Sequence, residues 1–213
     1  MDLQDITISG SGSIGKGNYK EVKISGSCKT LGDITAESVK ISGSLKAEGA
    51  VKAEEVKVSG SASFSKDMEA GELKVSGSVK VEDKIKCGQG VLNGSVKCKI
   101  IEGESVTVNG IITGCEEINA DEIHLGIGRT YINQLHADHI EIRLPAHGLF
   151  WRSFEVPEFD EIDCTDIKAE GMKCKKLCCK DCDLGEFCEI EYLEYSGIAN
   201  IQCKNKIKNI NKI

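Results

Sequence analysis

The sequence is poor in the residues that fill most globular cores: of its 213 residues, five are Phe, four are Tyr and one is Trp. Aromatic side chains supply much of the buried area of large cores, so a conventional globular core is not expected. Only two residues are Pro, whereas 23 are Gly. Small and β-branched side chains must fill the interior instead, which favours a narrow core built from thin layers.

Charge and hydropathy exclude further classes of protein. The formal net charge is −7, with 34 acidic and 27 basic residues, so no binding to nucleic acid is expected, since that needs a basic face. Residues 1–5 contain neither a basic region nor an apolar run, and no signal peptide is expected. No stretch reaches the length of apolar sequence that spans a membrane, about 18 residues. We therefore expect a cytoplasmic location, where the 11 cysteines would be reduced and mostly buried.

A repeat dominates the first two thirds of the chain. Four segments reading Val/Leu-Lys-Ile/Val-Ser-Gly-Ser follow one another at a constant interval of about 17 residues. Within each unit apolar and polar residues alternate, which is typical of β-strands. Three alternating pairs per unit, with Gly43 and Gly49 near the corners, predict a triangular turn of three short strands. The four segments start at Val22, Val39, Val56 and Leu73, and weaker copies start at Ile6, Val106, Ile123 and Ile140.

Stacking explains why one such unit recurs. A single turn cannot bury its own inner face, but stacked turns can, because each strand pairs with its copies above and below. At a strand spacing of about 4.8 Å, roughly eight turns before residue 145 would form a rod on the order of 40 Å long. The sequence predicts an all-β parallel β-helix solenoid with about 17 residues per turn over residues 1–144. The inner ladder is expected to contain Val22, Ile24, Val39, Ile41, Val56, Val58, Leu73 and Val75.

Lysines recur on the outer face of the predicted turns. Stacked like charges repel, but acidic residues such as Glu21, Glu55 and Glu72 recur beside them. We expect a charge-balanced, solvated face, with a basic stripe for anionic partners as the alternative. The two predicted lysine columns are Lys23, Lys40, Lys57 and Lys74, and Lys29, Lys46, Lys80 and Lys97.

The pattern changes after residue 144. Residues 145–160 contain four aromatic residues and are expected to form a joint or loop that packs on the rod, with a ligand platform as the alternative. Residues 161–203 are expected to form further β-helical turns with tighter corners, either coaxial with the first rod or not, and residues 204–213 a loosely ordered polar tail. In this extension apolar residues recur every five positions, at Ile162, Ile167, Met172, Leu177, Cys182 and Phe187.

The cysteine-rich extension contains the one cluster with metal-like spacing, Cys174, Cys178, Cys179 and Cys182. A zinc site needs four convergent ligands. The five-residue rhythm places Cys178 outside and the other three inside, so packing is favoured over a metal site. Cys178 and Cys188 are the candidates for exposed thiols.

Catalytic motifs are not found. By the alternation, the four histidines occupy outward or loop positions, and no Ser/His/Asp arrangement, paired carboxylates or phosphate loop stands out. A hexapeptide acyltransferase repeat is excluded because 17 is not a multiple of six. Neither an enzymatic activity nor a cofactor is expected. The histidines are His124, His136, His139 and His147.

The Val-Lys-Ile-Ser-Gly-Ser units, together with Tyr19-Lys-Glu-Val-Lys-Ile24, Leu31-Gly-Asp-Ile34 and Ala53-Glu-Glu-Val56, resemble the bactofilin family of polymer-forming bacterial cytoskeletal proteins. The resemblance is specific over residues 6–97 and weaker to residue 144. It implies a right-handed parallel β-helix that polymerises end to end into nucleotide-independent filaments, often near the membrane, supporting cell shape, polarity or motility. The chain departs from the family in lacking Pro-rich tails and an apolar N-terminus, and in its cysteine-rich extension.

Assembly is expected to begin at the first turn, around Ile6 and Ile8. Only five residues precede it, too few for a capping helix, and none is Pro. This edge is therefore expected to pair with a second copy, giving a homodimer or homopolymer. Residues 145–160 and the cysteine-rich turns are expected to cover the opposite end. The membrane surface and cell-envelope proteins are further expected partners. The alternative function is a non-polymerising binding module, dependent on metal or thiols through the cysteine-rich part.

Overall fold

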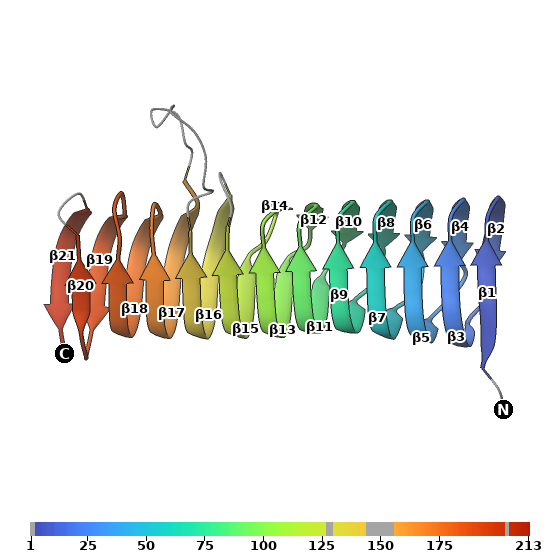
Figure 1. Cartoon of the computed structure of the whole chain (residues 1–213), viewed down its shortest axis with the longest axis horizontal. Helices are drawn as coiled ribbons and strands as arrows, with labels where there is room; N and C mark the ends of the chain where they lie inside the picture. The colour runs from blue at the N-terminus through green and yellow to red at the C-terminus, as the bar shows by residue number, and fades with distance from the viewer. Residues whose placement is uncertain (1–2, 127–129, 144–155, 203–204) are drawn as a thin grey trace.

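The computed structural model describes residues 3–126, 130–143, 156–202 and 205–213, and within these residues all regular structure is β-strand. The strands lie side by side along one rod, from β1 at one end to β21 at the other (Figure 1). They form a 14-stranded and a 7-stranded sheet, and neighbouring strands are parallel. The predicted all-β, parallel solenoid is confirmed.

Every strand belongs to one of these two sheets. The large sheet contains β1 (Gln4–Ile8), β3 (Gly17–Ile24), β5 (Ile34–Ile41), β7 (Val51–Val58), β9 (Met68–Val75), β11 (Lys84–Leu92), β13 (Ile100–Val108), β15 (Glu117–Leu125), β16 (Tyr131–Ile142), β17 (Glu158–Ala169), β18 (Lys173–Leu184), β19 (Glu189–Tyr195), β20 (Ala199–Ile201) and β21 (Lys206–Lys212). The small sheet contains β2 (Ser11–Ile14), β4 (Ser27–Thr30), β6 (Ser44–Ala47), β8 (Ser61–Phe64), β10 (Ser78–Val81), β12 (Ser95–Lys97) and β14 (Ile111–Thr113).

A typical turn contains two strands where the sequence predicted three. β5 joins the third strand of one unit to the first strand of the next, and β6 is the separate second strand. The join lies at Glu37 and Ser38, where two consecutive residues face outward between buried Ala36 and Val39. This break in the inward–outward alternation of side chains bends the strand. The pairing of β5 with β7 nevertheless continues, because Ser38 and Val39 stay in register with β7.

The other corner requires glycine. A Cβ atom on Gly43 would lie 2.0 Å from the carbonyl oxygen of Gly26 in the turn below. The amide of Gly43 meanwhile donates to the carbonyl oxygen of Ile24 (3.0 Å). Backbones therefore touch at each Ser-Gly-Ser corner, and a side chain would push the turns apart. The same approach, to within 1.9–2.0 Å of a backbone oxygen, recurs at Gly26, Gly60, Gly77, Gly94 and Gly110.

The interior is a set of apolar columns that run along the rod. In the column through Val58, Ile41 and Val75 are the direct register partners in the neighbouring turns. All eight residues of the predicted ladder are at most 2% exposed. No large aromatic core is needed, because each thin layer is closed by the layers beside it.

The cysteine-rich turns stack coaxially on the first rod, which the sequence left open. β17 pairs with β16 and β18 pairs with β17, so that Leu135, Ile162 and Leu177 share one column. The turns here are shorter than the first ones, because Ile162 pairs with Leu177, whereas Val39 pairs with Val56. The aromatic residue Phe159 is 2% exposed and belongs to this core. The rest of the predicted joint, up to residue 155, lies outside the described residues.

The five-residue rhythm fails at its last position. Phe187, predicted to face inward, is 41% exposed and has a φ of 63°. Cys188 occupies the inner position instead and is fully buried, so it is not the exposed thiol that the rhythm predicted. The cause is one extra residue in the turn that follows Leu184, which shifts the register of everything after it.

The polar tail is also ordered, contrary to expectation. β21 pairs with β19 along its length, and Ile207 packs on the core. Its isoleucines keep the spacing of the inner columns: Ile207 lies beside Ile190 and Ile210 beside Leu193. Two apolar residues per strand are enough to hold this polar segment in the ladder.

Candidate functional site

The two ends of the rod are open sheet edges. The large sheet begins at β1 and ends at β21, and β2 is the matching edge of the small sheet. Edge strands present backbone N–H and C=O groups that can pair with another chain. No helix lies over either end in the described parts of the chain. Both ends are therefore candidate sites of association.

The N-terminal edge has the character that the sequence predicted. Ile6 and Ile8 lie in register with Val22 and Ile24 of β3 and are half-buried against the core. The side of β1 that faces away from β3 is the outer edge of the sheet. The preceding residue Leu3 is exposed. A further turn placed on this edge would cover apolar side chains.

The cysteine-rich turns were expected to cover the C-terminal end, and this was wrong, whereas most of the other predicted cover, residues 145–160, lies outside the described residues. The cysteine-rich turns extend the rod, and their last strands, β20 and β21, form an edge of their own. Ile201 is 38% exposed and Ile210 is 55% exposed, although both occupy inner columns that are buried elsewhere. Ile198 and Ile213 add exposed apolar surface nearby.

One charge partly protects this end. Lys212 is the register partner of Tyr195, so it occupies an inner column at the edge. Its ammonium nitrogen lies 5.4 Å from the centre of the Tyr195 ring, within reach of a cation–π contact. An inward charge on an edge strand discourages uncontrolled pairing. The C-terminal edge thus combines an exposed apolar surface with an inward lysine, Lys212, that disfavours pairing with another chain.

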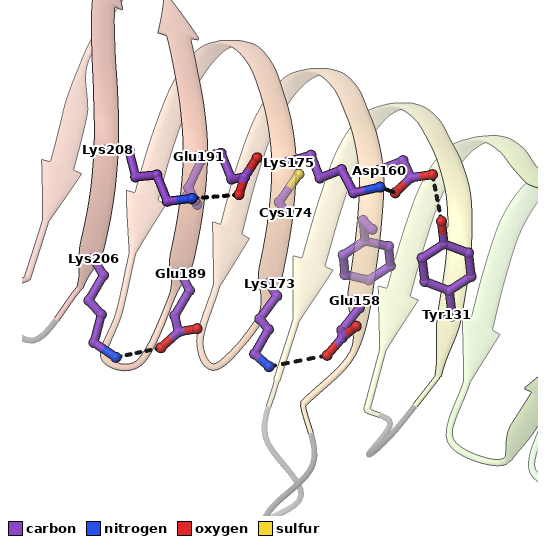
Figure 2. A pocket seen from close by; sticks show the side chains of 12 residues that line it. Tyr131, Glu158, Asp160, Lys173, Cys174, Lys175, Glu189, Glu191, Lys206 and Lys208 are labelled. Atoms are coloured by element: carbon purple, nitrogen blue, oxygen red, sulfur yellow. Dashed lines mark hydrogen bonds and ion pairs between the residues drawn. The ribbon is translucent and has the colours of Figure 1, made fainter.

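A groove of about 320 Å³ lies along the side of the rod near this end (Figure 2). Charged residues line it in an order that alternates from turn to turn. β17 and β19 contribute acids, and β18 and β21 contribute lysines. Each lysine meets an acid of the adjacent turn, in the pairs Lys173–Glu158 (3.2 Å), Lys175–Asp160 (2.6 Å), Lys206–Glu189 (2.6 Å) and Lys208–Glu191 (2.6 Å).

The groove is electrostatically satisfied. Lys175 and then Tyr131, which donates to Asp160 at 2.6 Å, lower the pKa of Asp160. The same contact with Asp160 raises the pKa of the Tyr131 hydroxyl. Lys208 likewise lowers the pKa of Glu191. Asp160 and Glu191 are thus held ionised by their lysines, so neither is poised as a general acid near neutral pH.

The lysine columns nearer the N-terminus are balanced in the expected way. Glu21 contacts Lys23 (2.7 Å) and Lys40 (2.9 Å). Hydrogen bonds from Lys23 and Lys40 lower the pKa of Glu21 to about 2. Lys57 contacts Glu55 in the same manner (2.5 Å). The stacked lysines are direct register partners, and the carboxylates of a neighbouring column flank them and offset their charge.

The cysteines of the metal-like cluster are spread over different columns. Cys174 lies in register with Phe159, Cys179 with Cys164 and Cys182 with Ile167. Cys178 lies beside Asp163 on the outer face and is half-buried. Among the described residues no group of three or more His, Cys, Asp or Glu side chains is arranged to hold a metal ion.

Two of the histidines contact carboxylates on the outer surface. His124 lies 3.3 Å from Glu141, and His139 contacts Asp166. Sequence reasoning placed these histidines outward but missed the pairing and the charged groove, because both depend on the register between turns. The sequence did contain a signal for the groove. Two residues of like charge stand two positions apart in each of these turns, and they are acidic in one turn and basic in the next. His147 lies outside the described residues.

The fold defines a class: a parallel β-solenoid whose end strands pair with a neighbouring strand on one side only. No family model matches the chain, and no curated protein matches it in sequence. Among solved structures, the chain is similar to the Tapirin C-terminal domain of Caldicellulosiruptor hydrothermalis, with a TM-score of 0.46 and 10% identity. The match covers 96% of this chain and 55% of that domain, so the chain spans about half of its length. In the part of the chain that the structure describes, no helix has the length and hydropathy to cross a membrane.

Proposed function

We propose that this protein is a non-catalytic structural protein that stacks end to end into nucleotide-independent filaments. The observation that carries the proposal is the pair of open parallel edges, β1 at one end and β20 with β21 at the other. A solenoid with two open ends can add copies at both, whereas one capped end would stop growth at a dimer.

The inner columns support a head-to-tail contact. The column that begins at Ile8 runs through every turn to Ile201. The column that begins at Ile6 ends in the same way at Ala199. If a second copy is placed coaxially on the C-terminal end, its Ile8 covers the exposed Ile201. The apolar columns then continue through the junction without a break.

The sequence resemblance extends the proposal to a cellular role. A bactofilin-like filament would serve as a cytoplasmic, cytoskeletal scaffold for cell shape, polarity or motility. In this role its principal partner is itself, and the membrane surface or cell-envelope proteins are secondary partners. The balanced charge of the outer columns supports the expectation that nucleic acid is not a partner.

The test places a charge at the proposed contact. Ile201→Lys puts an ammonium group in an inner column at the edge, where a stacked copy would bury it. Ile111→Lys is the matched control, because Ile111 is 59% exposed on β14, away from both ends. We expect light scattering at increasing concentration to show assembly of the wild type and of Ile111→Lys, and much weaker assembly of Ile201→Lys. Equal assembly of both variants would refute the contact.

A non-polymerising binding module is the second candidate function. It is favoured by Tyr131, which is half-exposed at the groove beside Asp160. A ring that is exposed on one face can stack on a partner while its hydroxyl stays bonded. This function predicts a monomer at all concentrations, so the same light-scattering series separates the two candidates.

A further inference from the structure

Each end of the rod is only half of a turn. At the C-terminal end β21 covers β19, whereas no strand in the described residues pairs with the outer side of β20. At the N-terminal end, the continuous pairing of β1 covers only the second half of β3, from Val22 to Ile24. In the first half of β3, Gly17 and Asn18 have no register partner on that side in the described part of the chain.

The two half-turns lie in complementary columns. When register partners are followed from turn to turn, the column that begins at Gly17 ends at Ile210, and the column that begins at Asn18 ends at Asn211. The columns that begin on β1 from Ile6 onward end on β20 instead. Thus β21 ends the columns that β1 leaves open, and β1 begins the columns that β21 leaves open.

The inner side chains at these open positions fit one another. Ile210 is 55% exposed, although the rest of its column is buried. Gly17 has no side chain, and the space that a Cβ would enter there is bounded by the Tyr19 ring (3.1–3.4 Å). Tyr19 therefore presents an aromatic surface where the Ile210 side chain of a stacked copy would lie. The residues between Gly17 and Ile210 in this column are all large and apolar: Ile34, Val51, Met68, Ile85, Ile101, Ile118, Leu135, Ile162, Leu177 and Leu193.

The outer side chains fit as well. Asn18 and Asn211 are both exposed on the outer face. Stacked asparagines already occur within the rod, where Asn109 donates to Asn93 of the adjacent turn (3.0 Å). Asn18 of one copy and Asn211 of another could pair in the same way.

We propose that β21 of one copy and β1 of the next copy complete one composite turn, in which β21 pairs as a parallel strand with the first half of the next copy's β3. The inference rests on the proposed head-to-tail stacking. Once β1 lies over β20, the register places Gly17 over Ile210 and Asn18 over Asn211. β18 shows that one turn holds both halves, since it pairs with β19 and with β20. The open half of β3 is thus a binding site for the C-terminal strand of a second copy.

One place in the composite turn is contested. Gln4 is the register partner of Tyr19, and the same column ends at Lys212, the partner of Tyr195. Gln4 must therefore leave Tyr19 before Lys212 takes its place. The register of β1 shifts between Gln4 and Ile6, so Gln4 is released while the rest of β1 stays paired. The exchange involves the same lysine that disfavours pairing at this edge.

Cysteine cross-linking tests the composite turn in the full-length protein. The double variant Asn18→Cys/Asn211→Cys is oxidised with copper phenanthroline at a concentration at which light scattering shows assembly. Partners on neighbouring strands lie about 4.8 Å apart, within the range of about 4.4–6.8 Å between the Cα atoms of a disulfide. The two positions lie at opposite ends of one rod (Figure 1), so a bond between them joins two copies. We expect tryptic peptide 17–20 to be linked to peptide 209–212, neither of which contains a native cysteine.

Two further pairs separate this proposal from the stacking on which it rests. Asn18→Cys/Asn200→Cys is the matched control, because Asn200 is exposed at the same end but lies in the column of Thr7, and it should give no 18–200 linkage. Thr7→Cys/Asn200→Cys reports the stacking itself. A 7–200 linkage without an 18–211 linkage would overturn the composite turn and leave the stacking intact. Absence of both linkages, with no assembly in light scattering, would refute the proposed function as well.

Deleting residues 2–4 tests the exchange at Tyr19. The shortened protein has no Gln4 to displace, so the 18–211 linkage should form in higher yield at the same subsaturating protein concentration. A linkage between two copies of peptide 17–20 would show head-to-head contact and overturn the proposal. An unchanged or lower yield of the 18–211 linkage after the deletion would overturn the exchange of Gln4 for Lys212.

Discussion

Replacing Val58 with Asp tests the inward columns directly. Val58 is 1% exposed and stacks between Ile41 and Val75. Losing a fully buried valine side chain costs about 1.5–3 kcal/mol, and leaving a polar group without a partner in an apolar core adds about 1–3 kcal/mol. The expected loss is therefore ~2.5–6 kcal/mol, a large part of the roughly 5–15 kcal/mol that stabilises a typical domain. The neighbouring turns cannot relax to absorb the carboxyl group, because the Gly43 and Gly60 corners fix their spacing.

Urea unfolding followed by circular dichroism measures this loss. Lys57→Asp is the matched control, since it introduces the same side chain one residue away, on the outer face. It removes only an exposed ion pair with Glu55, and exposed pairs contribute little to stability. Val58→Asp should shift the midpoint strongly or prevent soluble expression, and Lys57→Asp should shift it slightly. If the two variants unfold at the same midpoint, the inward assignment of this column is wrong.

Three further predictions follow from the same geometry. Gly43→Ala should destabilise the fold strongly, because the added Cβ would lie 2.0 Å from a backbone oxygen. Gly10→Ala is the control and should have little effect, because no atom lies within 4 Å of its added Cβ. Thermal melts of the two variants measure the difference. Glu21→Gln should lower the melting temperature at neutral pH. The pKa of Glu21 is depressed from 4.5 to about 2, first by the Lys23 hydrogen bond, so its stabilisation is present above pH 4.5 and disappears as the pH falls to about 2. A difference as large at pH 2 as at neutral pH would contradict this. Lys212→Val should increase assembly measured by dynamic light scattering, because it removes the inward charge from the C-terminal edge; unchanged particle size would show that the charge has no such role.

The fold could be predicted because its signals are repetitive. Period-two alternation and a fixed repeat length identify which residues face inward, and a single register error would have moved every one of them to the surface. Gly43 could be recognised as a corner residue from its place in the repeat. The contact that requires glycine there, with the backbone of the turn below, is visible only in three dimensions.

The errors lie where the period changes. One inserted residue after Leu184 exchanged the predicted positions of Phe187 and Cys188, and no local property of either residue signals the insertion. β21 was missed because lysine and asparagine dominate its composition, although Ile207 and Ile210 keep the spacing of a strand. Backbone pairing with β19 in the preceding turn outweighs the weak strand propensity of such a segment.

The candidate sites were less predictable than the fold. The N-terminal edge around Ile6 follows from the position of the first repeat, but the open C-terminal edge depended on whether the last turns stack coaxially. The groove beside Tyr131 and the spread of the cysteines over different columns depend on the shorter turns of this region and on the long insertion between β16 and β17. Such long-range register is not encoded in any local pattern.

Negative-stain electron microscopy of the purified protein tests end-to-end assembly most directly. The open edges predict unbranched filaments of uniform width, many times longer than one rod, that form without added nucleotide. Ile201→Lys should reduce them to short rods, and Ile111→Lys should leave them unchanged. A field of single short rods for the wild-type protein, at concentrations up to its solubility limit, would contradict the proposed function.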